Sequence, residues 1–170
     1  NYRMSNVIAG VVRGQYSYLE EHIAQKKAIY ERYREGFKNL PVQMNPIVPD
    51  TEPNYWLSAM IIDKECMCRQ VRDDSKALYI SEKGKTCPTE ILETLAKYNA
   101  EGRPIWKPMH MQPIYRMNPF VTIEGDGRAR TNAYIACEGI DVGADIFERG
   151  LCLPSDIKMT AEEQDIIIQI

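Results

Sequence analysis

Side chains that could bind a substrate are concentrated in one proline-rich stretch, Arg103 to Tyr115. It holds three of the ten prolines and one of the two histidines. Each proline fixes its own φ and favours an extended conformation in the preceding residue, so the sequence predicts a stiff, extended loop rather than a helix. Such a loop can aim polar groups at a ligand, and the candidates are Lys107, His110, Gln112 and Tyr115. The alternative for this stretch alone is a surface crossover whose aromatic residues pack on the core.

Cysteine is the other residue type here with chemistry of its own. The five cysteines are Cys66, Cys68, Cys87, Cys137 and Cys152. An odd number without a secretory leader is typical of reduced thiols in the cytoplasm. Cys66, Cys68, Cys87 and His110 could be imagined as zinc ligands, but their spacing does not fit the common Cys-x-x-Cys pattern. The sequence therefore favours ordinary buried cysteines and no metal site.

Composition excludes several classes of function. A chain of 170 residues with 44% apolar and 26% charged residues is typical of one globular domain with its own core. The net charge of −3 does not indicate the excess of positive charge that is typical of nucleic-acid-binding proteins. No apolar run approaches the roughly 18 residues that a membrane span needs. We therefore expect a cytoplasmic protein without nucleic-acid or membrane partners. Because the chain opens on Asn1 without an initiator Met, we also expect a piece of a longer protein.

The first forty residues read as a single helical element. Apolar residues at helical spacing, beginning with Ile8 and Val12, predict one long amphipathic helix over residues 6–38, which Pro41 ends. Gly10 and Gly14 would allow another backbone to approach its first turns closely. We therefore divide the chain into an interface helix, residues 1–40, and a small domain, residues 41–170.

The remainder mixes short strands with helices. The strands predicted from β-branched and aromatic residues cover 42–48, 54–62, 77–80, 120–123 and 151–154. Helices are predicted from Pro88 to a stop at Gly102, over 142–149 with Asp141 as its cap, and after a capping box formed by Thr160 and Glu163. This pattern predicts an α+β domain with a short antiparallel sheet packed against helices.

Three separated motifs resemble one family. They are Asn-Tyr-Arg-Met-Ser-Asn at the start, Trp-Lys-Pro-Met-His-Met-Gln-Pro-Ile-Tyr in the middle and Phe-Glu-Arg-Gly-Leu-Cys-Leu-Pro-Ser near the end. In this order they resemble the C-terminal part of the DegT/DnrJ/EryC1/StrS sugar aminotransferases, which are pyridoxal 5'-phosphate (PLP) enzymes. The resemblance spans nearly the whole chain, although the charged segment 63–85 looks like an insertion found in only some members.

The resemblance implies a fold and an activity. The fold would be the small C-terminal domain of the aspartate-aminotransferase (fold type I) architecture, preceded by a long connecting helix. The parent enzyme would transfer an amino group from glutamate to a nucleotide-diphosphate keto-sugar, in cell-surface or secondary-metabolite sugar biosynthesis. No lysine here matches the family's Schiff-base segment, so no catalytic residue is assigned to this chain. We expect the chain alone neither to transaminate nor to bind PLP tightly.

The resemblance also implies roles for single residues in a homodimer with shared sites. Asn1 matches the residue that reaches the PLP phosphate of the other subunit, and Arg3 lies beside it. His110 matches the histidine that faces the nucleotide sugar across the interface. Lys107, Gln112 and Tyr115 are substrate-binding candidates because they lie near it in the sequence.

Two alternatives stay open on the sequence alone. Some relatives are sugar dehydratases in which a histidine replaces the Schiff-base lysine, and that position lies outside this chain. The chain could also be an unrelated α+β binding or assembly module. Arg149 and Ser155 lie in or next to a family motif but receive no role from the sequence.

Overall fold

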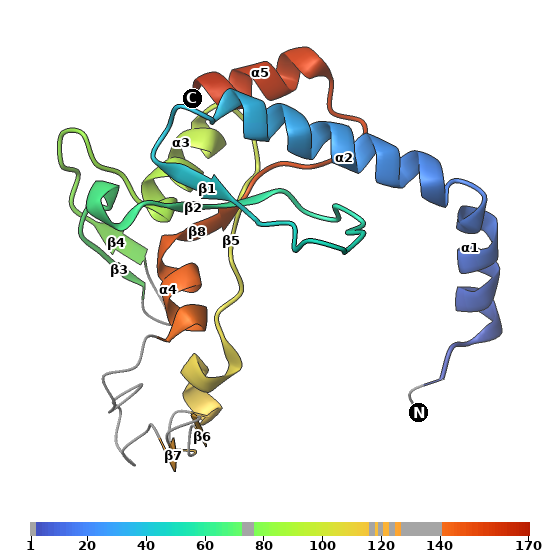
Figure 1. Cartoon of the computed structure of the whole chain (residues 1–170), viewed down its shortest axis with the longest axis horizontal. Helices are drawn as coiled ribbons and strands as arrows, with labels where there is room; N and C mark the ends of the chain where they lie inside the picture. The colour runs from blue at the N-terminus through green and yellow to red at the C-terminus, as the bar shows by residue number, and fades with distance from the viewer. Residues whose placement is uncertain (1–2, 73–76, 116–117, 119–120, 123–124, 127–140) are drawn as a thin grey trace.

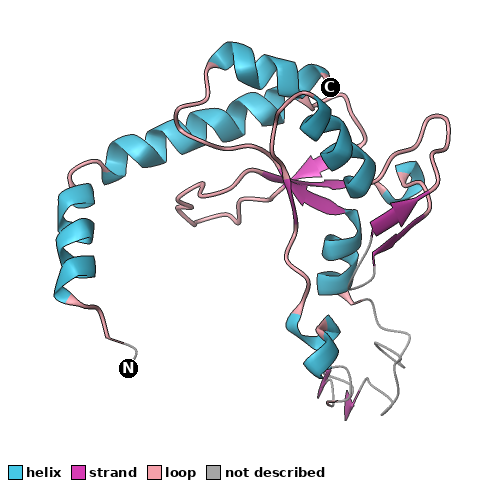
Figure 2. Ribbon diagram, turned by 180° about the vertical axis from the view of Figure 1, so that it is seen from behind, coloured by secondary structure: helices cyan, strands magenta, loops and turns pink. Residues whose placement is uncertain are grey.

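The computed structural model describes residues 3–72, 77–115, 118, 121–122, 125–126 and 141–170. Its centre is a four-stranded antiparallel sheet with neighbouring helices (Figures 1 and 2), so the predicted α+β class is confirmed. The strand order is β1 (Val42–Met44), β2 (Ala59–Ile62), β8 (Gly150–Cys152) and β5 (Arg103–Pro104). The helices are α1 (Asn6–Tyr16), α2 (Leu19–Gly36), α3 (Pro88–Lys97), α4 (Val142–Arg149) and α5 (Ala161–Gln169). Within this described part, none of the helices is both long and apolar enough to span a bilayer.

One row of side chains across the sheet forms the base of the core. The register pairs Met44 with Met60, Met60 with Leu151 and Leu151 with Pro104. Residues directly opposite one another in a sheet point to the same face, so the first three share a face, and all three are buried. The core cluster over this face combines α2, α3, α5 and the sheet through Ile29, Tyr30, Tyr33, Phe37, Met44, Met60, Leu95, Leu151, Leu153 and Ile167.

Helices α2 and α5 lie side by side and are joined by polar contacts (Figure 1). Arg32 of α2 donates to both carboxylate oxygens of Asp165 at 2.7 Å. The buried Gln164 donates from Nε2 to the carbonyl of Ile29 at 2.7 Å. α5 begins with the predicted capping box, in which Thr160 and Glu163 each accept from the other's backbone N–H.

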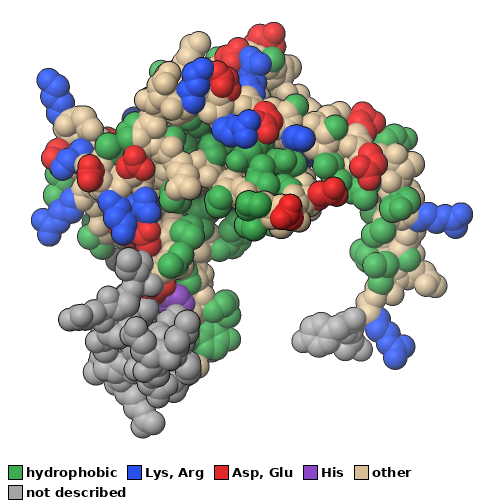
Figure 3. Space-filling model, viewed as in Figure 1, with side chains coloured by type: hydrophobic (Ala, Val, Ile, Leu, Met, Phe, Trp, Pro, Cys, Tyr) green, Lys and Arg blue, Asp and Glu red, His purple; other side chains and the backbone are tan. Residues whose placement is uncertain are grey.

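The prediction of one helix over residues 6–38 is wrong, because the chain bends at Ser17 and Tyr18 between α1 and α2. Ser5 caps α1, since its Oγ accepts from the N–H of Ile8 at 3.2 Å. None of the residues of α1 is buried, and Figure 3 shows hydrophobic side chains exposed along this arm. The exposed residues are Val7, Ile8, Val11, Val12 and Tyr16. Apolar residues recur at helical spacing through both helices, so the sequence pattern gives no sign of the bend. Of the two helices, α2 packs against the rest of the described chain, and this packing fixes its direction.

The predicted strands 42–48 and 54–62 are too long, because β1 ends at Met44 and β2 begins at Ala59. The intervening loop makes contacts that a strand could not: the Asn45 side chain accepts from the N–H of Ala59 at 3.0 Å, and Tyr55 has a φ of 53°. That left-handed conformation is incompatible with an extended strand.

Three further boundaries differ in smaller ways. α3 ends at Lys97 rather than at Gly102, because Asn99 takes the left-handed conformation with a φ of 58°. The predicted strand 77–80 is present as β4 (Ala77–Tyr79), and it pairs with β3 (Gln70–Arg72), which was not predicted. The predicted strand 151–154 is present as β8, shifted to Gly150–Cys152.

The strand predicted over 120–123 is described only in part. β6 (Val121–Thr122) pairs with β7 (Gly125–Asp126), and residues 120 and 123 lie outside the described residues.

The proline-rich loop is only partly as expected. Its first two residues form β5, the edge strand of the sheet, and the chain continues without regular structure to Pro108. Two single 3-10 turns follow, Met109–Met111 and Pro113–Tyr115. The expectation of a wholly extended loop without helix is therefore wrong for this second half. A single turn of 3-10 helix needs only an i to i+3 hydrogen bond, which the prolines at positions 108 and 113 do not block.

Candidate functional site

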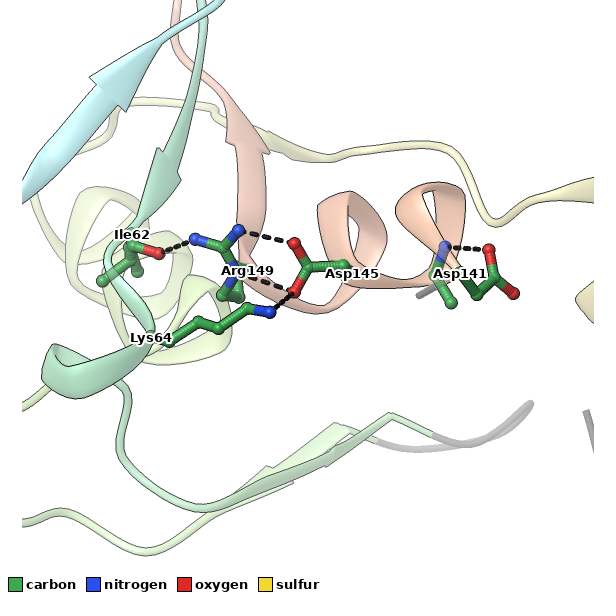
Figure 4. A network of polar contacts seen from close by, with 6 residues as sticks. Ile62, Lys64, Asp141, Asp145 and Arg149 are labelled. Carbon is green, nitrogen blue, oxygen red and sulfur yellow. Dashed lines mark hydrogen bonds and ion pairs between the residues drawn. The ribbon is translucent and has the colours of Figure 1, made fainter. Parts of the chain in front are cut away.

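His110 is held by a carboxylate from a distant part of the chain. Its Nε2 lies 2.5 Å from Oδ2 of Asp141, and the two side chains are only 17% and 14% exposed. The other oxygen of Asp141 accepts from the N–H of Ala144 at 2.9 Å and so caps α4 (Figure 4). One carboxylate therefore fixes the first turn of a helix and the orientation of the imidazole. With Nε2 committed to the carboxylate, Nδ1 accepts a hydrogen bond in the neutral ring and donates one in the imidazolium.

The backbone of the loop is packed against the same helix end. A Cβ built on Gly143 would lie 3.3 Å from Cγ of Pro108, so this side chain occupies the space that the glycine leaves. Gln112 donates from Nε2 to the carbonyl of Lys107 at 3.2 Å, which closes the loop on itself. Lys107 and Gln112 are half-buried, and Tyr115 is exposed. These contacts hold the loop backbone that carries His110, and the hydrogen bond of the Gln112 side chain contributes to them.

The C-terminal end of α4 is fixed by Arg149 (Figure 4). Its Nε and Nη2 donate to the two oxygens of Asp145 at 3.0 and 2.6 Å, and its Nη1 donates to the carbonyl of Ile62 at 2.5 Å. Lys64 lies 3.3 Å from the same carboxylate. The hydrogen bond from Arg149, with a further contribution from Lys64, holds the pKa of Asp145 below its usual value. Arg149 therefore has a structural role, which the sequence did not assign: it joins α4 to β2.

Ser155, the other residue left without a role, is also structural. Its Oγ accepts from the N–H of Ser58 at 3.2 Å and donates to the carbonyl of Leu153 at 2.9 Å. Lys26 of α2 donates to the carbonyl of Ser155. The next carbonyl upstream, that of Pro154, accepts from the Tyr33 hydroxyl at 2.8 Å. The end of this motif therefore ties the sheet to α2.

The proposed cofactor contacts lie elsewhere. Arg3 is exposed at the beginning of the arm that α1 forms, and Asn1 lies outside the described residues. In Figure 1, α1 hangs from the right-hand end of α2, whereas the turns of residues 109–115 (yellow) lie below the sheet, on the far side of the open space from α1. The structure therefore does not bring Arg3 and His110 together within one chain.

The described residues do not fit PLP on their own. A cavity of about 460 Å³ between α2, α3, α5 and the sheet is lined mainly by apolar side chains, and its Lys85 is paired with Glu82 at 2.8 Å. A smaller hollow of about 340 Å³ is lined by Lys64, Arg69 and Arg149 together with the carboxylates of Asp145 and Glu148. Lys64 and Arg149 both contact Asp145. Neither space offers the cradle of donors that a phosphate needs.

The cysteines form no metal centre in the described part, where no group of three or more potential metal ligands occurs. Cys68 and Cys87 are buried next to each other. Burial, reinforced by a hydrogen bond with Cys87, raises the pKa of Cys68 to about 11. Cys68 is therefore a neutral thiol near pH 7, which is a poor nucleophile and a poor metal ligand. Cys137 lies outside the described residues.

The comparisons with known proteins identify the class. The model of the DegT/DnrJ/EryC1/StrS aminotransferase family matches residues 1–170. The chain is 31% identical, over its whole length, to EpsN of Bacillus subtilis strain 168, assigned as a pyridoxal phosphate-dependent aminotransferase, and covers 36% of that protein. It is 29% identical over 68% of its length to the GDP-perosamine synthase of Vibrio cholerae, of which it covers 26%. The chain belongs to the DegT/DnrJ/EryC1/StrS aminotransferase family and matches between about a quarter and about a third of the length of these relatives.

Solved structures show the same fold. The sugar aminotransferase assigned as Spr1654 of Streptococcus pneumoniae superimposes with a TM-score of 0.67 at 18% identity, over 98% of this chain and 34% of that one. A GDP-4-keto-6-deoxymannose-3-dehydratase, ColD, also shares the fold, with a TM-score of 0.59 at 14% identity over 92% of this chain and 32% of that one. The mixed helix and antiparallel-sheet domain is therefore one that fold-type I aminotransferases and a dehydratase have in common.

Proposed function

We propose that the protein to which this chain belongs is a PLP-dependent aminotransferase of nucleotide-diphosphate keto-sugars, with glutamate as the amino donor. The match of the family model to residues 1–170 carries this proposal. The relatives support it, since one is assigned as a PLP-dependent aminotransferase and another is a GDP-perosamine synthase. We place the reaction in the cytoplasm, in keeping with the four described cysteines, all free thiols.

The chain's own residues would bind and orient the substrate. PLP, when bound by the whole enzyme, supplies the electron sink for the reaction. His110, held by Asp141, would hydrogen-bond a sugar hydroxyl or the diphosphate. Lys107 would contribute positive charge to the same loop, with Gln112 and Tyr115 beside it.

We propose that Asn1 and Arg3 reach the cofactor phosphate of another subunit in a homodimer with shared sites. An amide offers two donors to phosphate oxygens, and a guanidinium can form paired, charge-assisted hydrogen bonds. The exposed apolar residues of α1 support an interface beside Arg3.

The rival function is that of a sugar dehydratase, because the fold is compatible with both reactions. The two reactions change the keto-sugar in different ways. A transaminase consumes glutamate and replaces the keto oxygen of the sugar by an amino group, whereas a dehydratase removes a hydroxyl group as water and leaves no amino group on the product.

The test is to incubate the full-length parent protein, loaded with PLP, with glutamate and a nucleotide-diphosphate keto-sugar. We expect 2-oxoglutarate to accumulate in a one-to-one ratio with an amino-sugar identified by mass spectrometry. The proposal would be overturned by a product that lacks a hydroxyl group. It would also be overturned if no glutamate-dependent product forms with keto-sugars linked to uridine, guanosine or thymidine diphosphate.

A further inference from the structure

The two tryptophans of the chain stack on each other at the surface. Trp56 lies in the loop before β2, and Trp106 lies in the proline-rich loop after β5. Their ring centroids are 5.9 Å apart with an interplanar angle of 30°. Each nevertheless remains exposed, at 64% and 63%. Because tryptophan is among the more deeply buried residue types on average, a pair that keeps so much aromatic surface in water requires an explanation.

The backbone at Trp56 is built to keep this ring on the surface. Tyr55 adopts the left-handed conformation with a φ of 53°, which is rare for a bulky residue and costs conformational free energy. Its ring packs against Tyr30 of the core with centroids 5.4 Å apart. The side chain of Asn54 accepts from the N–H of Trp56 at 3.1 Å and stabilises the turn. The strained residue therefore sends one aromatic ring into the core and leaves the next one exposed.

Trp106 is presented by the segment that also carries His110. Pro104 pairs with Leu151 in the sheet, and Pro108 packs against Gly143 of α4. The backbone that carries Trp106 is thus held on both sides, immediately before Lys107. Trp106 therefore lies in the same loop as the proposed sugar contact, and the cationic Lys107 lies between Trp106 and His110 in the sequence.

We propose that Trp56 and Trp106 form the platform on which the planar base of the nucleotide-diphosphate sugar stacks. This rests on the proposed function, since the base is the one planar aromatic group that such a substrate carries. An exposed aromatic face stacks on purines and pyrimidines alike, because every base has a π-face. Stacking on this pair strengthens the binding of any base and makes no hydrogen bond that distinguishes one base from another. Other residues discriminate between the bases.

The test measures binding without chemistry, in the full-length parent protein. UDP, GDP, thymidine diphosphate and inorganic pyrophosphate are titrated by calorimetry into the wild type and into Trp56→Ala, Trp56→Phe and Trp106→Ala. Tyr98→Ala is the matched control, because Tyr98 is an equally exposed aromatic residue at the end of α3. Thermal unfolding of each variant reports on folding.

We expect each alanine variant to bind UDP and GDP about 10-fold more weakly or worse, and pyrophosphate as the wild type does. Trp56→Phe, which keeps an aromatic face, should retain most of the affinity, and Tyr98→Ala all of it. If Trp106→Ala does not fold, Trp56→Ala and Trp56→Phe decide the question.

Unchanged nucleoside-diphosphate affinity in the alanine variants, or no binding of UDP, GDP or thymidine diphosphate by the wild type, would overturn the platform. So would a change in oligomeric mass with unchanged affinity. A parent protein that binds UDP or GDP through these tryptophans but does not transaminate would overturn the proposed function and leave the platform in place.

Discussion

Replacing Arg149 by methionine is expected to lower the free energy of unfolding of the 170-residue chain by about 3 kcal/mol. The change removes a bidentate pair with Asp145 and a hydrogen bond to the carbonyl of Ile62, while the methylene groups of the side chain are largely kept. The Arg149 side chain is only 13% exposed, so water replaces these bonds poorly. Urea unfolding followed by circular dichroism measures the difference.

Arg103→Met is the matched control. This arginine also pairs with a carboxylate, that of Glu101, but its side chain is 75% exposed. Pairs exposed to this extent contribute little, so the control should stay within about 0.5 kcal/mol of the wild type. Equal effects of the two substitutions would show that Arg149 does not anchor α4.

The stabilising effect of Arg149 should depend on pH in a defined direction. The pKa of Asp145 is lowered in the folded chain, so the stability that it contributes is present above its unfolded-state pKa of about 3.9. That contribution is lost as the pH falls through the lower folded-state value. The gap between wild type and Arg149→Met should therefore be constant from pH 7 to pH 5 and narrow towards pH 3. A gap that widens on acidification would contradict the assignment.

Substitutions of Asp141 are expected to separate its two contacts. Asp141→Ala removes both the cap of α4 and the partner of His110, whereas Asp141→Ser keeps a capping hydroxyl but is too short to hold the imidazole. We expect Asp141→Ala to lower the free energy of unfolding by about 1 to 2 kcal/mol and Asp141→Ser by only a few tenths. Both should lower the parent enzyme's kcat/KM for the nucleotide sugar by about 10- to 100-fold, because the imidazole is no longer held in place.

A double-mutant cycle tests whether that loss of activity passes through His110. In a His110→Ala background, Asp141→Ser should cause little further loss of kcat/KM, because residues that act as one unit are not additive. If the two losses multiply instead, Asp141 acts independently and does not position the histidine.

Features set by local chemistry could be predicted from the sequence. Asp141 caps α4, and the box of Thr160 and Glu163 opens α5, because a cap depends on side chains within one turn of the helix. The α+β class followed from alternating strand and helix patterns, and the family resemblance followed from three motifs in order. These predictions need no knowledge of how distant segments pack.

Features set by distant contacts could not be predicted. The bend at Ser17 reflects the absence of packing on α1 within the described part of the chain, and periodicity carries no sign of that. The contact of His110 with Asp141 and the stacking of Trp56 on Trp106 join residues far apart in the sequence. The left-handed Tyr55 interrupts the predicted strand 54–62 near its start, and no local propensity indicates it.

We propose that this chain supplies the substrate-facing edge of an aminotransferase site that another subunit completes. Complementation tests it directly, by mixing and reassociating two full-length variants: His110→Ala, whose activity is reduced, and an inactive one in which the Schiff-base lysine, outside residues 1–170, is replaced. We expect transamination to return to roughly a quarter of the wild-type rate, because half of the randomly formed dimers carry one intact site. If exchange of subunits is verified by mass and the activity of the mixture stays at the level of the separate variants, His110 does not act across the interface.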